Sequence, residues 1–182
     1  MPALPGKSPQ EVKDCILNGY NTNAVNPHDE YSMNRPAHIL LVEDNRMDVE
    51  LTLDAFREAR LGNSVQVARN GQEALAYLQG AGTYADRNQF PLPDIILLDL
   101  KMPGIDGFEV LRRAKAMPGI KRIPVIILTS SKDEGDRALS YDCGANSYLV
   151  KPVSFEGFLK VVKEVQDYWV VLNVGPPKEE PS

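Results

Sequence analysis

Short apolar runs that alternate with helix-like segments constrain the fold of this 182-residue chain more than any other feature. Strand-like runs are predicted at residues 38–42, 64–68, 95–98, 125–128 and 147–150. Their alternation with segments of helical period is typical of repeated βαβ units and a parallel sheet. Because crossovers between parallel strands are right-handed, five such units predict an α/β three-layer sandwich with helices on both faces of the sheet.

Helix signals occupy the segments between the apolar runs. Asn70, followed three residues later by Glu73, has the spacing of a capping box and predicts the start of the second helix. The helix before it places Val49, Leu53 and Phe56 at helical spacing. The expected helices cover residues from about 49 to 62, 70 to 78, 107 to 116, 133 to 143 and 154 to 169.

Two features of this pattern allow more than one interpretation. The connection at residues 80–93 is long for a compact domain, and both a tolerated surface insertion and a functional loop are open. The last helix carries an apolar stripe that extends to Trp169. Ordinary core packing and a dimer or partner surface both explain such a stripe.

Composition excludes several classes of protein. A net charge of -5 and a pI near 5.1 argue against general attraction to nucleic acid or to an anionic membrane surface. Cys15 and Cys143 are too few for a disulfide framework. The sequence has no signal-peptide core and no apolar run long enough to span a bilayer. We therefore expect a cytoplasmic protein whose partners are proteins or small phosphates.

The two ends of the chain differ in composition from its centre. Residues 1–36 contain five prolines and show no sustained periodicity, so a mostly disordered leader is expected, with a candidate short helix at 9–17. Residues 37–174 are expected to form one domain, and 175–182 a flexible polar tail. Whether residues 1–32 belong to the natural product, or translation begins at Met33, stays open.

Polar residues follow four of the five predicted strands. Glu43 and Asp44 follow the first strand, Asp99 the third, Thr129 the fourth and Lys151 the fifth. In an open parallel sheet, ligands bind in the crevice outside the carboxyl ends of the strands. The sequence therefore predicts that three carboxylates, a hydroxyl and an ammonium group converge at one edge.

Such a convergence suits phosphoryl chemistry. The carboxylates of Glu43, Asp44 and Asp99 repel one another, and a divalent cation is the simplest compensation. His28 and His38 lie away from this edge, and oxygen-only ligands select a hard cation that keeps several waters, typically Mg²⁺. With Mg²⁺ bound, a carboxylate can attack phosphorus, which makes Asp99 the candidate nucleophile.

Two further groups complete this candidate site. Lys151 would offset the negative charge of the phosphoryl group, and the Thr129 hydroxyl would donate a hydrogen bond to one of its oxygens. Taken singly, each group also has an ordinary explanation, such as a turn aspartate, a helix cap at Thr129 and Ser130, or a surface lysine. Their joint placement favours the site. The peptide bond before Pro152 is compatible with both the cis and the trans isomer.

The residues resemble the response-regulator receiver family of two-component signalling. The resemblance covers about residues 38–173 and rests on four motifs in order. These are Leu41-Val42-Glu43-Asp44-Asn45, Leu97-Leu98-Asp99-Leu100-Lys101-Met102-Pro103-Gly104-Ile105-Asp106-Gly107, Leu128-Thr129-Ser130, and Tyr148-Leu149-Val150-Lys151-Pro152. The family fold is flavodoxin-like and doubly wound, so the expected five-stranded parallel sheet has the order 2-1-3-4-5.

The resemblance also implies roles for the site residues. Asp44 and Asp99 would ligate Mg²⁺ directly, Glu43 largely through water, and the backbone carbonyl of Lys101 would be a further ligand. Thr129 and Tyr148 would form the switch that reports phosphorylation to the fourth helix, the fifth strand and the fifth helix. Lys101 and Ser131 occupy positions at which receivers differ in acyl-phosphate lifetime.

The implied function is that of a stand-alone phosphoacceptor without enzymatic activity beyond its own phosphotransfer and autodephosphorylation. The expected phosphodonor is a sensor histidine kinase, a hybrid kinase or a phosphotransfer protein, and the expected target is a downstream protein. A second copy of the chain is a further expected partner, in a homodimer through the fourth helix, fifth strand and fifth helix. The chain is similar to receivers paired with bacterial phytochrome-type and hybrid kinases. A phosphorylation-independent pseudo-receiver is one alternative. A haloacid-dehalogenase-like phosphatase is the other, although such enzymes carry an aspartate where this chain has Lys101.

Overall fold

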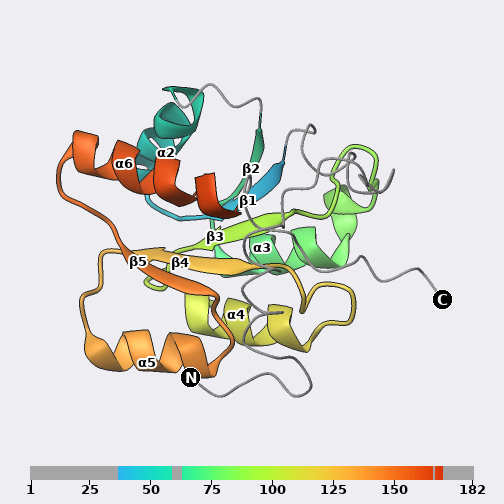
Figure 1. The fold of residues 1–182 in the computed structure, drawn as a ribbon. Helices are drawn as coiled ribbons and strands as arrows, with labels where there is room; N and C mark the ends of the chain where they lie inside the picture. Colours follow the sequence, from blue (N-terminus) through green and yellow to red (C-terminus); the bar gives the residue numbers. More distant parts are fainter. Residues whose placement is uncertain (1–36, 59–62, 166, 170–182) are drawn as a thin grey trace, which may run out of the picture. The chain divides into compact units, whose positions relative to one another are not determined.

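A five-stranded parallel sheet forms the centre of the structure, a computed structural model that describes residues 37–58, 63–165 and 167–169 (Figure 1). Its strand order is β2-β1-β3-β4-β5, and every neighbouring pair is parallel. The strands are β1 (His38–Val42), β2 (Ser64–Ala68), β3 (Ile95–Leu98), β4 (Val125–Thr129) and β5 (Ser147–Val150). The predicted flavodoxin-like α/β fold and its strand order are confirmed.

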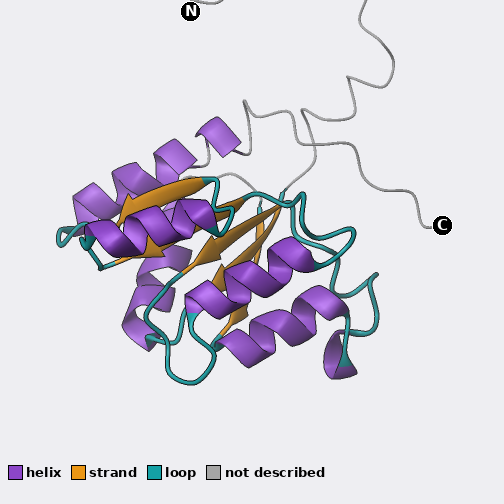
Figure 2. Ribbon diagram, turned by 90° about the horizontal axis from the view of Figure 1, so that it is seen from below, coloured by secondary structure: helices purple, strands orange, loops and turns teal. Residues whose placement is uncertain are grey.

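Helices cover both faces of this sheet (Figure 2). They are α2 (Arg46–Glu58), α3 (Gly71–Gln79), α4 (Gly107–Ala116), α5 (Glu134–Asp142) and α6 (Phe155–Val165), and a 3₁₀ turn, η1 (Gly82–Tyr84), follows α3. The observed α4 has the predicted bounds. Residues 167–169 form a turn of π-helix after α6, and Trp169 packs, partly buried, against the core.

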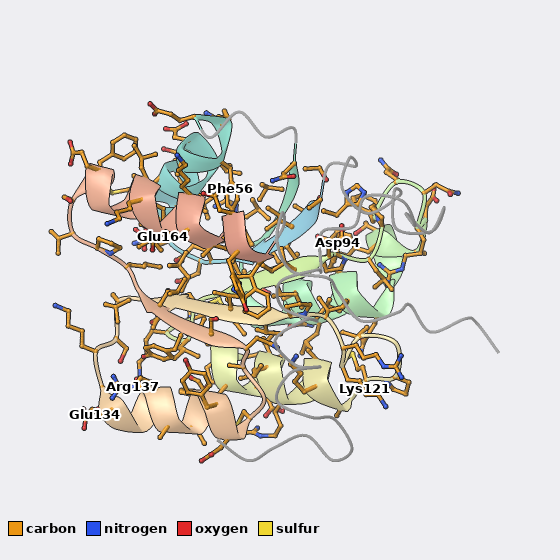
Figure 3. All side chains as sticks on the ribbon, viewed as in Figure 1. Phe56, Asp94, Lys121, Glu134, Arg137 and Glu164 are labelled. Carbon is orange, nitrogen blue, oxygen red and sulfur yellow. The ribbon has the colours of Figure 1, made fainter. Side chains whose placement is uncertain are left out.

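Each central strand divides its side chains between two apolar clusters. In β1, Leu40 and Val42 face the cluster that contains α3 and α4, while Ile39 and Leu41 face the one that contains α2 and α6. Phe56 of α2 belongs to this second cluster (Figure 3). Because β1, β3 and β4 are covered on both faces, their sequences do not alternate and are apolar apart from His38 at the start of β1 and Thr129 at the end of β4.

Polar side chains fix the points at which the helices begin. Asn45 Oδ1 accepts a hydrogen bond of 2.9 Å from the Met47 amide at the start of α2. Asp106 and Asp133 cap α4 and α5 in the same way. The cap of α5 is thus Asp133, not Thr129 or Ser130. Each such cap contributes about 1 kcal/mol, and those of α2, α4 and α5 fix the loops at the carboxyl edge.

The predicted capping box of α3 is present with one shift. Asn70 Oδ1 accepts from the Glu73 amide at 2.8 Å, as expected. The Glu73 side chain, however, accepts from the amide of Arg69 at 2.8 Å rather than from that of Asn70. The reciprocal bond therefore goes to the residue just before the cap, and two backbone amides at the helix start, those of Arg69 and Glu73, still have side-chain acceptors.

The long connection at residues 80–93 is folded onto the end of α3. Arg87 donates hydrogen bonds of 2.8 Å to the Tyr77 carbonyl and 2.6 Å to the Leu78 carbonyl, which satisfies acceptors that the helix end leaves open. Tyr77, Tyr84 and Phe90 form edge-to-face ring contacts with centroids 5.1 to 6.4 Å apart. The segment is therefore an integral part of the α3 side of the core, to which these hydrogen bonds and ring contacts attach it.

Several sequence predictions fall outside the described residues. The leader at 1–36, including the candidate helix at 9–17, and the tail at 175–182 remain predictions, as do the domain boundaries at 37 and 174. The predicted end of the first helix near Gly62 lies in the undescribed segment 59–62. Within the described residues, no helix combines the length and apolarity needed to cross a membrane.

Candidate functional site

The parallel register brings Glu43 and Asp99 side by side. Val42 of β1 is paired with Leu98 of β3, so the next residue of each strand leaves the sheet at the same level. The Asp99 amide still donates to the Val42 carbonyl at 3.0 Å, which fixes the start of the loop after β3. Both carboxyl-bearing residues are buried, Glu43 at 2% and Asp99 at 7% exposure. The predicted convergence of acidic groups at this edge follows from the sheet itself.

Asp44 completes a group of three carboxylates with these two residues. One oxygen from each of Glu43, Asp44 and Asp99 lies within 4.8 Å of the others, and Asp44 is exposed to solvent. The set contains only oxygen donors, which fits a hard divalent cation and disfavours zinc or copper. The Lys101 amide donates to Asp99 Oδ1 at 3.3 Å, so the loop that carries the Lys101 carbonyl turns back over Asp99.

Lys151 extends from the end of β5 into this acidic group. Its Nζ lies 2.5 Å from Glu43 Oε2, 2.7 Å from Asp48 Oδ2 and 3.0 Å from Asp99 Oδ2. Burial alone would lower the pKa of the ammonium, but its hydrogen bonds to Asp48 and Glu43 and the charge of Asp99 raise the pKa of Lys151 above its usual range. Lys151 therefore remains charged beside Asp99.

The burial of Glu43 changes its protonation. Burial above all, with a smaller effect of the Asp99 charge, raises the pKa of Glu43 to about 7 against the opposing effect of the Lys151 ammonium. The Asn45 amide donates to Glu43 Oε1 at 3.1 Å. The carboxyl group of Glu43 is thus partly protonated near neutral pH, which is the response expected of a buried carboxyl group.

Thr129 and Tyr148 meet at the backbone of one residue. Thr129 is fully buried, and its Oγ1 accepts a hydrogen bond of 3.3 Å from the Ser131 amide. The Tyr148 hydroxyl donates to the Ser131 carbonyl at 3.1 Å, and its partly buried ring packs against the α4 side of the core. The two predicted switch residues are therefore joined through the loop between β4 and α5.

Sequence reasoning missed two acidic residues at this edge. Asp48 binds Lys151 from the first turn of α2, and Asp136 binds Lys101 from the first turn of α5. Acidic residues are common in first turns because the helix dipole favours them, so neither stood out. The available signal for Asp48 was its place in the first turn of the helix that directly follows Glu43 and Asp44.

The peptide bond between Lys151 and Pro152, for which the sequence allowed both isomers, is trans. The described part of the chain contains no cis peptide bond.

Comparison with known proteins agrees with this geometry. A family model described as the response regulator receiver domain matches residues 39–163. Response regulator Rcp1 of Synechocystis sp. is 38% identical over 137 residues, which cover 75% of this chain and 91% of Rcp1.

Solved structures with the same fold have similar levels of identity. The phosphorylated cyanobacterial phytochrome response regulator RcpA superposes with a TM-score of 0.74 at 38% identity, over 79% of this chain and 100% of RcpA. The Mn²⁺-bound form of Rcp1 gives a TM-score of 0.71 at 37% identity, over 78% of this chain and 100% of that structure. The matched segment contains the five strands except for His38, the first residue of β1, and it includes Glu43, Asp44, Asp99, Thr129 and Lys151. The chain belongs to the response regulator receiver domain family of two-component signalling.

Proposed function

We propose that this protein accepts a phosphoryl group on Asp99 from a histidine kinase or phosphotransfer protein, in a Mg²⁺-dependent reaction in the cytoplasm. The observation that carries the proposal is the position of the Lys151 ammonium, 3.0 Å from Asp99 Oδ2, beside a group of three carboxylates. A buried aspartate that has both a cation-binding group and a fixed ammonium beside it is suited to attack phosphorus.

The proposed cation is Mg²⁺. Asp44 and Asp99 would hold it directly, Glu43 through water, and the backbone carbonyl of Lys101 would be a further ligand. When bound, Mg²⁺ would offset the negative charge of the carboxylate and phosphoryl oxygens. Its support here is the oxygen-only donor set, together with a relative, Rcp1, whose structure contains Mn²⁺.

The chain's own residues account for the rest of the transfer. An oxygen of Asp99 forms a bond to phosphorus while the P–N bond of the donor's phosphohistidine breaks, and the electron pair of that bond stays on the imidazole. Lys151 donates a hydrogen bond to the phosphoryl group and offsets its charge. Thr129 turns its hydroxyl from the Ser131 amide toward a phosphoryl oxygen. The product is an acyl phosphate on Asp99.

We propose that the signal leaves through a changed protein-binding surface. The donor would be a kinase of the phytochrome type or a hybrid kinase, because the similar protein RcpA is a phytochrome response regulator, and the target would be a downstream protein.

A phosphorylation-independent binding module is less well supported, because the acidic, hydroxyl and lysine groups are all in place. The phosphatase alternative lacks its second aspartate, since Lys101 occupies that position and pairs with Asp136.

Acetyl phosphate with Mg²⁺ tests this function directly. We expect wild type to gain one phosphoryl group, located on Asp99 by mass spectrometry, and Asp99→Asn to gain none. Asp54→Asn is the matched control, because Asp54 is an exposed α2 carboxylate paired with Arg57, and this variant should label as wild type does. Full labelling of Asp99→Asn, or phosphate found at another residue in wild type, would contradict the proposal. Phosphotransfer from purified histidine kinases would then identify the donor.

A further inference from the structure

Three carboxylates hold the ammonium of Lys151, and they come from three different elements. Glu43 follows β1, Asp99 follows β3, and Asp48 projects from the first turn of α2. An ammonium group has three N–H donors, so these three acceptors use all of them. The Lys151 side chain is 9% exposed, and that of Asp48 is 34% exposed. Lys151 is thus fixed on all sides, although its four-carbon stem is flexible.

Asp48 is free to serve Lys151 because the start of α2 is already capped. Asn45 Oδ1 accepts from the amides of Met47 and Asp48, at 2.9 and 3.3 Å. The Asp48 backbone is also secured, since its carbonyl accepts a 2.7 Å hydrogen bond from the hydroxyl of Thr52, which is buried. The carboxylate is therefore presented from a packed helix rather than from a loop, a suitable arrangement for positioning a reacting group.

Phosphorylation of Asp99 changes one of the three contacts of Lys151. Asp48 lies nearer to the ammonium than Asp99 does, 2.7 Å against 3.0 Å. Phosphorylation removes negative charge from the Asp99 carboxylate and places it on the phosphoryl oxygens. The N–H that faces Asp99 can then transfer to a phosphoryl oxygen, while those on Glu43 and Asp48 stay in place.

We infer that Asp48 is a positioning residue for phosphoryl transfer, which acts by holding the Lys151 ammonium and does not touch the phosphoryl group. This inference rests on the function proposed above. Without the Asp48 carboxylate, one N–H of Lys151 turns to water, and the flexible side chain spends less time beside Asp99. The rate of phosphorylation falls for that reason, while the fold and the metal ligands are unchanged.

Two readouts on four proteins test the inference: wild type, Asp48→Asn, Asp48→Glu and Glu50→Gln. Glu50 is the matched control, since it is an exposed α2 carboxylate paired with Arg46 at 3.0 Å. The first readout is the initial rate of Asp99 labelling by acetyl phosphate with Mg²⁺. We expect Asp48→Asn to be about tenfold slower, on the scale of one charge-assisted hydrogen bond. Asp48→Glu should recover much of the rate, and Glu50→Gln should match wild type.

The second readout needs neither Mg²⁺ nor phosphate. In metal-free protein with ¹⁵N-labelled lysine, NMR measures how fast the Lys151 ammonium exchanges hydrogen with water. Exchange should be faster in Asp48→Asn than in wild type and unchanged in Glu50→Gln. A hydrogen-exchange rate in Asp48→Asn equal to that in Glu50→Gln would overturn the inference. Slower labelling of Asp48→Asn without faster hydrogen exchange would also overturn it. Failure of wild type to label at Asp99 would refute the proposed function instead, while the exchange measurement would still judge the hold of Asp48 on Lys151.

Discussion

The Lys101 ammonium lies 2.7 Å from the Asp136 carboxylate, so an ion pair joins the loop after β3 to the first turn of α5. The same Asp136 oxygen accepts a 2.7 Å hydrogen bond from the Ser131 hydroxyl. Tyr148 in turn donates to the Ser131 carbonyl. The loop after β3 and the loop between β4 and α5 are therefore linked to β5 through Asp136 and Ser131.

Replacement of Asp136 by alanine should loosen the loop between β4 and α5. The variant loses both the Lys101 ion pair and the Ser131 hydrogen bond, so backbone amides at residues 130–133 should exchange hydrogen faster than in wild type. The free energy of unfolding should fall by only about 1 kcal/mol, because the Lys101 end of the ion pair is exposed to solvent. Hydrogen exchange with mass spectrometry and urea denaturation measure the two effects.

Glu134→Ala is the control for this variant. Glu134 lies in the same turn of α5, and its carboxylate pairs with Arg137 at 3.3 Å at the exposed start of the helix (Figure 3). The Glu134→Ala substitution removes an equal charge without removing a contact to the loop between β4 and α5. Equal exchange rates at residues 130–133 in Asp136→Ala and Glu134→Ala would show that the link through Asp136 does not restrain this loop.

The stability of the domain should depend on Tyr84 at alkaline pH. The Tyr84 hydroxyl donates to Glu73 Oε1 at 2.7 Å. Burial, and then this hydrogen bond, raise its pKa from 10.0 to about 12. Because the folded pKa lies above the unfolded one, the contribution is complete below pH 10 and is lost as the pH rises through about 12.

The variant Tyr84→Phe isolates this contribution. Urea denaturation should show wild type more stable than Tyr84→Phe by about 1 kcal/mol below pH 10, with the difference shrinking above that pH. Tyrosinate absorption during the same titration should show one high-pKa group fewer in the variant. A difference between the two proteins that stays constant from neutral to strongly alkaline pH would rule out a coupled Tyr84 hydroxyl.

The fold and most of the site could be predicted because they depend on local pattern and sheet register. A strand covered on both faces must be apolar throughout, as β3 is, and neighbouring parallel strands must place Glu43 and Asp99 together. The contacts of long side chains were not predictable in the same way. Lys151 reaches Asp48 across 103 positions of sequence, and that contact depends on where α2 packs against the sheet. The same is true of Lys101 and Asp136, and of Arg87 at the end of α3.

Replacement of Asp44 should weaken binding of Mg²⁺. Asp44 is the exposed member of the three-carboxylate group, so Asp44→Ala removes a ligand without opening a cavity in the core. We expect a loss of affinity of at least about tenfold by calorimetric titration. The rise in melting temperature with added Mg²⁺ should shrink accordingly and vanish with EDTA, since a ligand stabilises only the state that binds it. Glu50→Ala, on the exposed side of α2, should bind Mg²⁺ as wild type does. If Asp44→Ala bound Mg²⁺ with the affinity of wild type, Asp44 would not be a ligand.

Phosphorylation should drive homodimerisation through α5, β5 and α6. This surface carries exposed apolar side chains, with Leu139 at 44%, Tyr141 at 50% and Phe155 at 42% exposure. When the Thr129 hydroxyl turns to a phosphoryl oxygen, it gives up the Ser131 amide, and the loop that anchors the Tyr148 hydroxyl is released. The Tyr148 ring can then turn inward and change the surface, a two-state element that the phosphoryl group biases.

Sedimentation with and without the phosphoryl mimic beryllofluoride tests this output route. Wild type should approach the mass of a dimer with the mimic, whereas Tyr148→Ala should stay a monomer because it lacks the ring. Tyr148→Phe separates the two parts of the switch, since it keeps the ring but loses the hydrogen bond to Ser131, and it should dimerise more readily than wild type without the mimic. An unchanged wild-type mass, or an equal shift in wild type and Tyr148→Ala, would direct the search for the output surface to another segment, such as the folded connection at residues 80–93.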